Sequence, residues 1–191
     1  FAGSIAVSTG VLEVLDGFGG DIEVVADGTL RFVQSADRTF SGVLTGTGSL
    51  SKQGSGTTTF TEVSTSYSGT ATVSGGTLLI NGTLGGVSSL IQVASGGALG
   101  GGGTLGGALT VQSGGTLAPG NSIGTLSAAN GAVFQSGSTY EVEIDAAGNT
   151  DLLAVTGQAS LAGMLKVIAL GYPTGYPPVQ DYTILTATGG V

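Results

Sequence analysis

The run Val73-Ser74-Gly75-Gly76-Thr77-Leu78 decides the fold, because the chain repeats it twice. It returns at residues 93–99, with Ala in place of Thr, and again at residues 111–117, each time with one extra residue after the Val. The serines of the three copies are 21 and 18 residues apart. Short apolar and polar alternation bounded by glycines predicts a strand followed by a tight turn. A repeat of about 20 residues built from such units is typical of a solenoid.

Equivalent side chains of the copies are expected to stack in columns through the interior. Burying a Leu or Val side chain contributes about 1.5–3 kcal/mol, so one turn alone cannot offset the ordering of its backbone. Stacked turns also share hydrogen bonds at about 4.8 Å spacing, and about eight turns would make a rod of roughly 40 Å. The expected columns are Leu78–Leu99–Leu117 and Val73–Val93–Val111.

The rest of the chain fits the same architecture. Apolar residues at helical spacing are nowhere sustained. The hairpin dipeptide Asn-Gly occurs only at residues 81–82 and 130–131, which disfavours an antiparallel sandwich. The sequence therefore predicts an all-β, right-handed parallel β-helix (a solenoid) with a C-terminal β cap. Very short strands are expected at residues 4–7, 12–14, 22–24, 29–32, 70–73 and 108–111.

The composition excludes several classes of protein. The 191 residues include 38 Gly and no His or Cys, so no Ser-His-Asp triad, thiol nucleophile or usual zinc site can form. Four cations against 12 carboxylates give a net charge of −8, which argues against a nucleic-acid partner. No apolar run reaches the ~18–20 residues of a membrane helix, so direct membrane insertion is not expected. We expect a protein that is not an enzyme.

The character of the chain changes after Pro119. Strands are expected to lengthen from Val133 onward, and solenoids need a terminal cap to close their open end. The sequence predicts β-helix turns over residues 1–120 and a continuous cap over residues 121–191. The aromatic residues that gather in the cap are Phe134, Tyr140, Tyr172, Tyr176 and Tyr182.

Residues 39–56, 67–78 and 117–126 resemble the passenger domains of Gram-negative autotransporters. Residues 39–56 are similar to the passenger-associated repeat of that family, and residues 67–78 continue the pattern. The run Leu117-Ala118-Pro119-Gly120-Asn121-Ser122-Ile123-Gly124-Thr125-Leu126 is a more specific match. Further matches are residues 151–163 and the strand at residues 182–187. The resemblance covers nearly all of residues 39–191 and is less clear over residues 1–38.

One stretch departs from the family pattern. At Thr57-Thr58-Thr59-Phe60-Thr61-Glu62-Val63 the usual Leu-rich strand is replaced. We expect a local bulge or loop there.

The resemblance implies the C-terminal part of a passenger exported by type V secretion. Its expected role is a structural stem and autochaperone-like folding segment of a virulence or surface factor. It would act outside or on the surface of a Gram-negative bacterium, after passage through the periplasm. Expected partners are passenger turns upstream and a membrane barrel downstream, and we expect this chain to be a piece of such a longer polypeptide.

Two other functions stay open. The chain could instead be an adhesin or receptor-binding module that contacts a host-cell protein or glycan, because a long β-helix presents flat ladders of side chains. An enzyme acting on polysaccharide is suggested by the fold alone, which is a weak warrant.

Three carboxylates share one face of a predicted strand. Glu141, Glu143 and Asp145 alternate with apolar residues, a pattern that could serve Ca²⁺ or glycosidase chemistry but is typical of a solvated outer face. Asp21 and Glu23 follow the same pattern and receive the same interpretation. We therefore expect no catalytic, cofactor-binding or metal-ligating residue, and no cofactor.

Four shorter motifs are interpreted as structural. Residues 17–21 resemble a Ca²⁺-binding nonapeptide but occur once. Residues 101–106 match G-x-G-x-x-G without a following helix, so we expect a turn. Residues 81–83 form a glycosylation sequon and are also expected to be a turn. The Tyr-Pro loop at residues 172–178 is either an exposed contact surface or packed on the cap.

Overall fold

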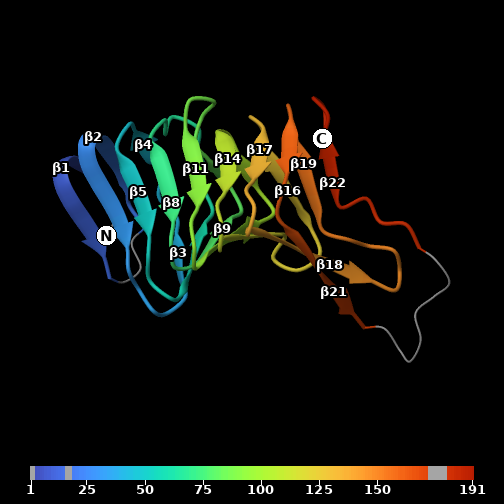
Figure 1. Cartoon of the computed structure of the whole chain (residues 1–191). Coiled ribbons are helices and arrows are strands. Elements are labelled where there is room, and N and C mark those ends of the chain that lie inside the picture. Colours follow the sequence, from blue (N-terminus) through green and yellow to red (C-terminus); the bar gives the residue numbers. More distant parts are fainter. Residues whose placement is uncertain (1–2, 16–18, 172–179) are drawn as a thin grey trace.

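The chain forms one coil of parallel strands, described by a computed structural model over residues 3–15, 19–171 and 180–191 (Figure 1). The strands lie in three sheets along the coil, and β1 and β22 lie near opposite ends of it (Figure 1). From β5 onward, each turn contributes one strand to each sheet in the same order. Thus β8, β9 and β10 make one turn, and β11, β12 and β13 make the next.

The first sheet has nine strands, eight of them in continuous order with β4 beside β2: β1 (Ser4–Val14), β2 (Asp21–Phe32), β4 (Leu44–Gly46), β5 (Ser49–Lys52), β8 (Thr70–Val73), β11 (Leu90–Val93), β14 (Ala108–Val111), β17 (Ala132–Phe134) and β20 (Ala159–Leu161). The second sheet has seven: β3 (Arg38–Phe40), β6 (Thr57–Phe60), β9 (Gly76–Ile80), β12 (Gly97–Gly101), β15 (Thr116–Pro119), β18 (Thr139–Asp145) and β21 (Met164–Leu170). The third has six: β7 (Val63–Ser64), β10 (Thr83–Leu84), β13 (Thr104–Leu105), β16 (Thr125–Ala128), β19 (Leu152–Val155) and β22 (Leu185–Ala187).

The predicted fold class is confirmed. Neighbouring strands pair in parallel within all three sheets, for example β8 with β11 and β9 with β12. The described part of the chain contains no helix. The eight strands in continuous order in the first sheet correspond to a solenoid of about eight turns.

Both predicted columns of side chains are present in the core. In the first sheet the Val column is in register, with Val93 paired to Val73 on one side and to Val111 on the other. In the second sheet Leu99 pairs in the same way with Leu78 and Leu117. All six side chains are at most 1% exposed. Repetition in sequence has therefore become repetition along the axis of the coil.

The strands at the N-terminal end are longer than expected. Residues 4–7 and 12–14 both lie in β1, and residues 22–24 and 29–32 both lie in β2. The register between β1 and β2 shifts between Val7 and Thr9. That irregularity lets each strand continue past the polar residues that interrupt the apolar pattern. The expectation of very short strands is wrong for these two elements.

The expectation of a bulge or loop at residues 57–63 is wrong for residues 57–60, which form a strand. Residues 57–60 form the regular strand β6, which pairs with β3 and β9. Phe60 takes the core position and packs against Phe40, with ring centroids 4.8 Å apart. Thr58 faces the interior and accepts a 2.6 Å hydrogen bond from Nε2 of Gln34, which is also buried. A polar pair thus replaces the usual Leu.

A buried lysine interrupts the apolar interior. Lys52 is 0% exposed and lies in register between Phe32 and Val73. Its Nζ donates hydrogen bonds to the carbonyl oxygens of Gly54 and Gly75. Burial lowers the pKa of Lys52, because the charged ammonium is removed from water.

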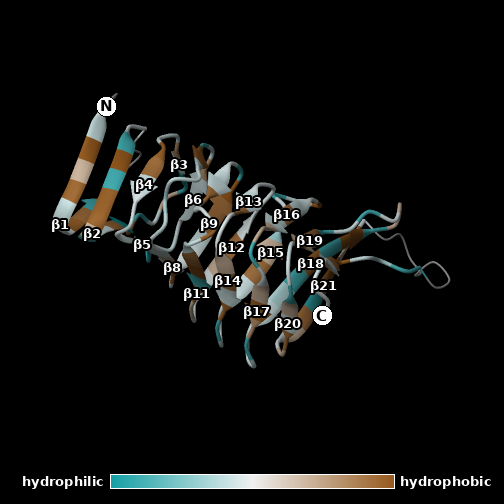
Figure 2. Cartoon of the chain, turned by 90° about the horizontal axis from the view of Figure 1, so that it is seen from above, coloured by the Kyte–Doolittle hydropathy of each residue, from teal (hydrophilic) through white to brown (hydrophobic). Residues whose placement is uncertain are grey.

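The sheets continue through the C-terminal region. The third sheet pairs β13 with β16, β16 with β19 and β19 with β22. The interior positions of the last turn remain partly open: Leu165 pairs with buried Tyr140 and Val167 with buried Val142, yet they are 49% and 51% exposed. Figure 2 shows apolar colouring along the strands at this end. The division of the chain at residue 120 stays a prediction.

Candidate functional site

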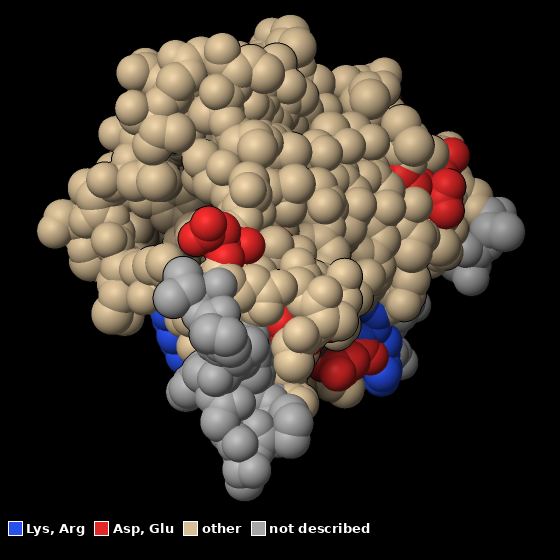
Figure 3. Space-filling model, turned by 90° about the vertical axis from the view of Figure 1, so that its right-hand side faces the viewer, with Lys and Arg blue, Asp and Glu red and all other residues tan. Residues whose placement is uncertain are grey.

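The most structured polar region lies on the outer side of β18. Glu141 and Glu143 alternate with the buried Tyr140 and Val142, so they face outward as the sequence predicts. The face is only half exposed, however, and not a fully solvated one. The face of the molecule shown in Figure 3 is mostly uncharged, with carboxylates in separate patches.

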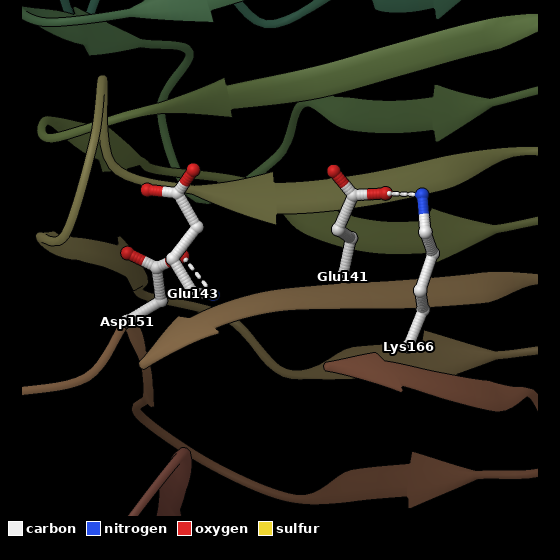
Figure 4. A network of polar contacts seen from close by, with 4 residues as sticks. All are labelled: Glu141, Glu143, Asp151 and Lys166. Atoms are coloured by element: carbon white, nitrogen blue, oxygen red, sulfur yellow. Dashed lines mark hydrogen bonds and ion pairs between the residues drawn. The ribbon is translucent and has the colours of Figure 1, made fainter. Parts of the chain in front are cut away.

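The carboxylates of this strand have different partners. Oε2 of Glu141 forms an ion pair with Nζ of Lys166, 2.7 Å away, and Lys166 lies opposite Glu141 on β21 (Figure 4). Asp145 closes a turn by accepting hydrogen bonds from Nδ2 and the backbone N–H of Asn149 and from the N–H of Ala147. These bonds, that of the Asn149 side chain first, lower the pKa of Asp145. Glu143 differs, because its Oε2 is buried and has no hydrogen-bond partner.

Asp151 links three segments of the chain beside Glu143 (Figure 4). It lies just before β19 and is only 2% exposed. Oδ1 accepts a 2.9 Å hydrogen bond from the N–H of Gly124, in the loop between β15 and β16. Oδ2 accepts a 2.7 Å hydrogen bond from the N–H of Glu143. Burial raises the pKa of Asp151, although both hydrogen bonds oppose the shift.

A groove of about 170 Å³ runs from these carboxylates across the outer face of the second sheet. Its floor is made of the small outward residues Ala98, Gly100 and Ala118. Leu79 lines one side, and the loop after β15 closes an end. The groove therefore has apolar and acidic walls together. Its full lining is Thr77, Leu79, Ala98, Leu99, Gly100, Ala118, Pro119, Gly120, Asn121, Ser122, Glu141, Glu143 and Asp151.

The other predicted pair of carboxylates, Asp21 and Glu23, does not line this groove. Asp21 and Glu23 are exposed on β2, and Asp21 accepts a 2.8 Å hydrogen bond from the N–H of Val43. Of the nonapeptide-like stretch, Gly17 and Phe18 lie outside the described residues. The Tyr-Pro loop at residues 172–178 also lies outside them.

Two motifs contain a turn, as predicted, but each also extends into a strand. Residues 102–103 connect β12 to β13, and Gly101, which ends β12, has a φ of 105°. In the sequon, Thr83 already belongs to β10. Asn81 of the sequon lies between β9 and β10 and uses its Oδ1 to accept hydrogen bonds from the N–H of Gly102 and from Nδ2 of Asn121. These contacts bind one turn of the coil to the next two turns.

Within residues 3–15, 19–171 and 180–191, no three His, Cys, Asp or Glu side chains are grouped so that they could hold a metal ion. In the same ranges, no helix has the length and hydropathy needed to span a bilayer.

Sequence reasoning missed two buried ionisable residues. The composition counts Lys52 only among the four cations, but the two-residue period places it on the same face as the buried Leu50. Asp151 is the first residue of the family-like stretch at residues 151–163. Its position directly before the alternating strand β19 is the signal that marks it as a loop-anchoring residue.

We expect Asp151→Ala to lower the free energy of unfolding by about 2–4 kcal/mol, since two backbone N–H groups lose their acceptor. Asp27→Ala, at an exposed carboxylate, should change it by less than about 0.5 kcal/mol. Urea titrations followed by circular dichroism measure both. Equal effects of the two substitutions would refute the anchoring role.

The free energy of unfolding should also depend on pH through Asp151, with a defined sign. The pKa of Asp151 in the folded state is raised above 3.8. As the pH rises, the Asp151 carboxyl therefore loses its proton in the unfolded chain before it does so in the folded chain. The contribution of Asp151 to stability therefore falls as pH rises from about 3.8 through the folded-state pKa. Asp151→Asn removes this contribution, so the stability of the wild type relative to the variant should decrease with pH over that range.

The sequence is similar to part of a known extracellular protein and to no protein-family model. No protein-family model matches the sequence. The chain is similar to an extracellular serine protease of Serratia marcescens, with 35% identity over 160 residues. The matched region covers 80% of this chain and 15% of that protein. The chain therefore resembles one segment of a much longer extracellular protein.

Proposed function

We propose that the chain is a structural stem and folding-assisting segment of a larger secreted protein, of the autotransporter passenger type that its motifs resemble. The observation that carries this proposal is the continuous parallel stacking from β1 to β22 around one predominantly apolar interior. Similarity to a segment of an extracellular protein supports secretion. A rod of stacked turns suits a stem because each turn is stabilised by its neighbours.

We also propose that this segment is not itself catalytic. The chain has no His and no Cys, so it cannot supply a Ser-His-Asp triad or a thiol nucleophile. The relative is a serine protease, but the similarity spans only 15% of its length. In a parent protein with such activity, the catalytic residues would lie outside this segment.

The proposed setting is the exterior or surface of a Gram-negative bacterium, reached through the periplasm. The proposed partners are further passenger turns before the chain and a membrane barrel after it. The half-exposed interior positions of the last turn support contact with additional chain, because Leu165 and Val167 occupy positions that are buried one turn earlier.

The folding-assisting role is supported by side-chain links that hold the last turns together. The hydroxyl of Tyr140 donates a hydrogen bond to the carbonyl of Ile184, 44 residues away. The hydroxyl of Tyr182 donates one of 2.7 Å to the carbonyl of Asp145. Tyr140 also packs on Phe134, with ring centroids 5.4 Å apart. With the Asp151 contacts, these links would let the C-terminal turns form early and template the others.

A truncation experiment tests the folding role. A chain of residues 1–120 exposes the interior at Leu117 and Val111 and lacks the C-terminal links, so it should refold from urea in lower yield than residues 1–191. A chain of residues 38–191, trimmed at the other end, is the control and should refold in high yield. Refolding is measured by recovered circular dichroism and resistance to protease. Equal recovery of the two truncated chains would contradict the proposal.

A further inference from the structure

The groove on the outer face of the second sheet joins an apolar floor to an acidic side. Its floor is apolar and flat, because Ala98, Gly100 and Ala118 carry small side chains or none. The larger side chain of Leu79 forms a wall on β9. Glu141 and Glu143 from β18 form the acidic side. A ligand lying in the groove would contact hydrocarbon along its length and negative charge beside it.

The charge in the groove is incompletely balanced. Lys166 pairs with Glu141, and the backbone N–H groups of Gly124 and Glu143 satisfy Asp151. Glu143 has one oxygen that is buried and without a hydrogen-bond partner. Such an oxygen costs free energy unless a positive charge or donor lies near it. A cation in the groove would supply that compensation.

The shape of the groove selects the kind of cation. No aromatic side chain lines it, so it lacks the stacking platform that would favour a sugar ring or a quaternary ammonium group. Its carboxylates are not grouped as metal ligands among the described residues. Lysine and arginine side chains combine an apolar stem with a charged head, which matches an apolar floor beside a carboxylate.

We propose that this groove binds a lysine or arginine side chain of a partner polypeptide, with the stem on Ala98, Gly100 and Ala118 and the charged head at Glu143. Charge complementarity supports this occupant, since the chain carries a net charge of −8. The inference goes beyond the stem role and does not depend on it. It gives the outer face of the second sheet a docking function for a basic segment.

The test uses the ¹⁵N-labelled chain of residues 1–191 and three small probes, followed by amide chemical shifts. The probes are the N-acetyl methylamides of arginine, lysine and citrulline, the last being the uncharged analogue of arginine. Arginine or lysine should give saturable shifts at Gly100, Ala118 and Glu143. Citrulline should bind at least about tenfold more weakly because it lacks the charge. Equal shifts with citrulline, or no saturation with any probe, would overturn the proposal.

Variants locate the site. Glu143→Gln should weaken binding of the arginine probe about tenfold, and Ala98→Leu should abolish it by filling the floor. Glu23→Gln removes an exposed carboxylate on β2 and should leave binding unchanged. Circular dichroism of each variant verifies that the fold is retained. Saturable shifts at the same amides with methyl glucoside, unaffected by Glu143→Gln, would identify a glycan groove and refute the basic-side-chain assignment.

Discussion

Gly101→Ala is expected to lower the free energy of unfolding by about 3–6 kcal/mol, enough to disrupt the middle of the coil. Gly101 ends β12 with a φ of 105°, a conformation that L side chains rarely adopt. A Cβ there would lie 2.2 Å from the carbonyl oxygen and 2.5 Å from the amide nitrogen of Ile80 on the preceding turn. Both are backbone atoms, so neither can move aside without opening the spacing between turns.

Gly96→Ala is the matched control for that substitution. Gly96 also has positive φ, at 85°, but a Cβ there would meet only the carbonyl oxygen of Ser74, at 3.5 Å. Its cost should be confined to the backbone strain, about 1–2 kcal/mol. Urea unfolding and amide hydrogen exchange of the two variants make the comparison. Similar losses at both positions would show that close stacking of backbones does not set the role of Gly101.

Leu99→Ala is expected to destabilise the chain by about 3–5 kcal/mol. Leu99 is 0% exposed and sits between Leu78 and Leu117, so truncation leaves a cavity bounded by both neighbouring turns. Because a solenoid turn contacts mainly its neighbours, amide exchange should rise first in β9, β12 and β15.

The control for the interior column is Leu90→Ala. Leu90 lies on the outer face of β11 and is 47% exposed, so its truncation should cost less than about 1 kcal/mol. Thermal and urea unfolding of both variants provide the measurement. A loss at Leu90 as large as that at Leu99 would contradict the assignment of inward and outward faces.

The repeating parts of the fold follow directly from the sequence. Leu78, Leu99 and Leu117 occupy equivalent places in three copies of one motif, and parallel pairing brings them into register. The glycines between the copies mark the turns because few other residues allow such close approach. Alternation also places Glu141 and Glu143 correctly on the outside of β18.

What could not be predicted depends on contacts between turns that are distant in sequence. Thr58 stands where the family pattern has Leu, but Gln34 from the preceding turn donates a hydrogen bond to its buried hydroxyl. The strand β6 therefore forms. Half-burial of Glu143 arises from Asp151 and from the loop after β15, which the pattern of β18 alone does not contain. The groove likewise requires small residues on two neighbouring strands and acidic ones on a third, a juxtaposition set by register.

The proposed stem and folding role is tested most directly in the longer secreted protein that we propose contains this chain. Residues 121–191 are deleted, and the displayed or secreted product is treated with protease and followed by immunoblotting. We expect the region before the deletion to become protease-sensitive, because its turns lose the C-terminal end on which they stack. Unchanged resistance to protease, with the product still exported, would contradict the role proposed for this chain.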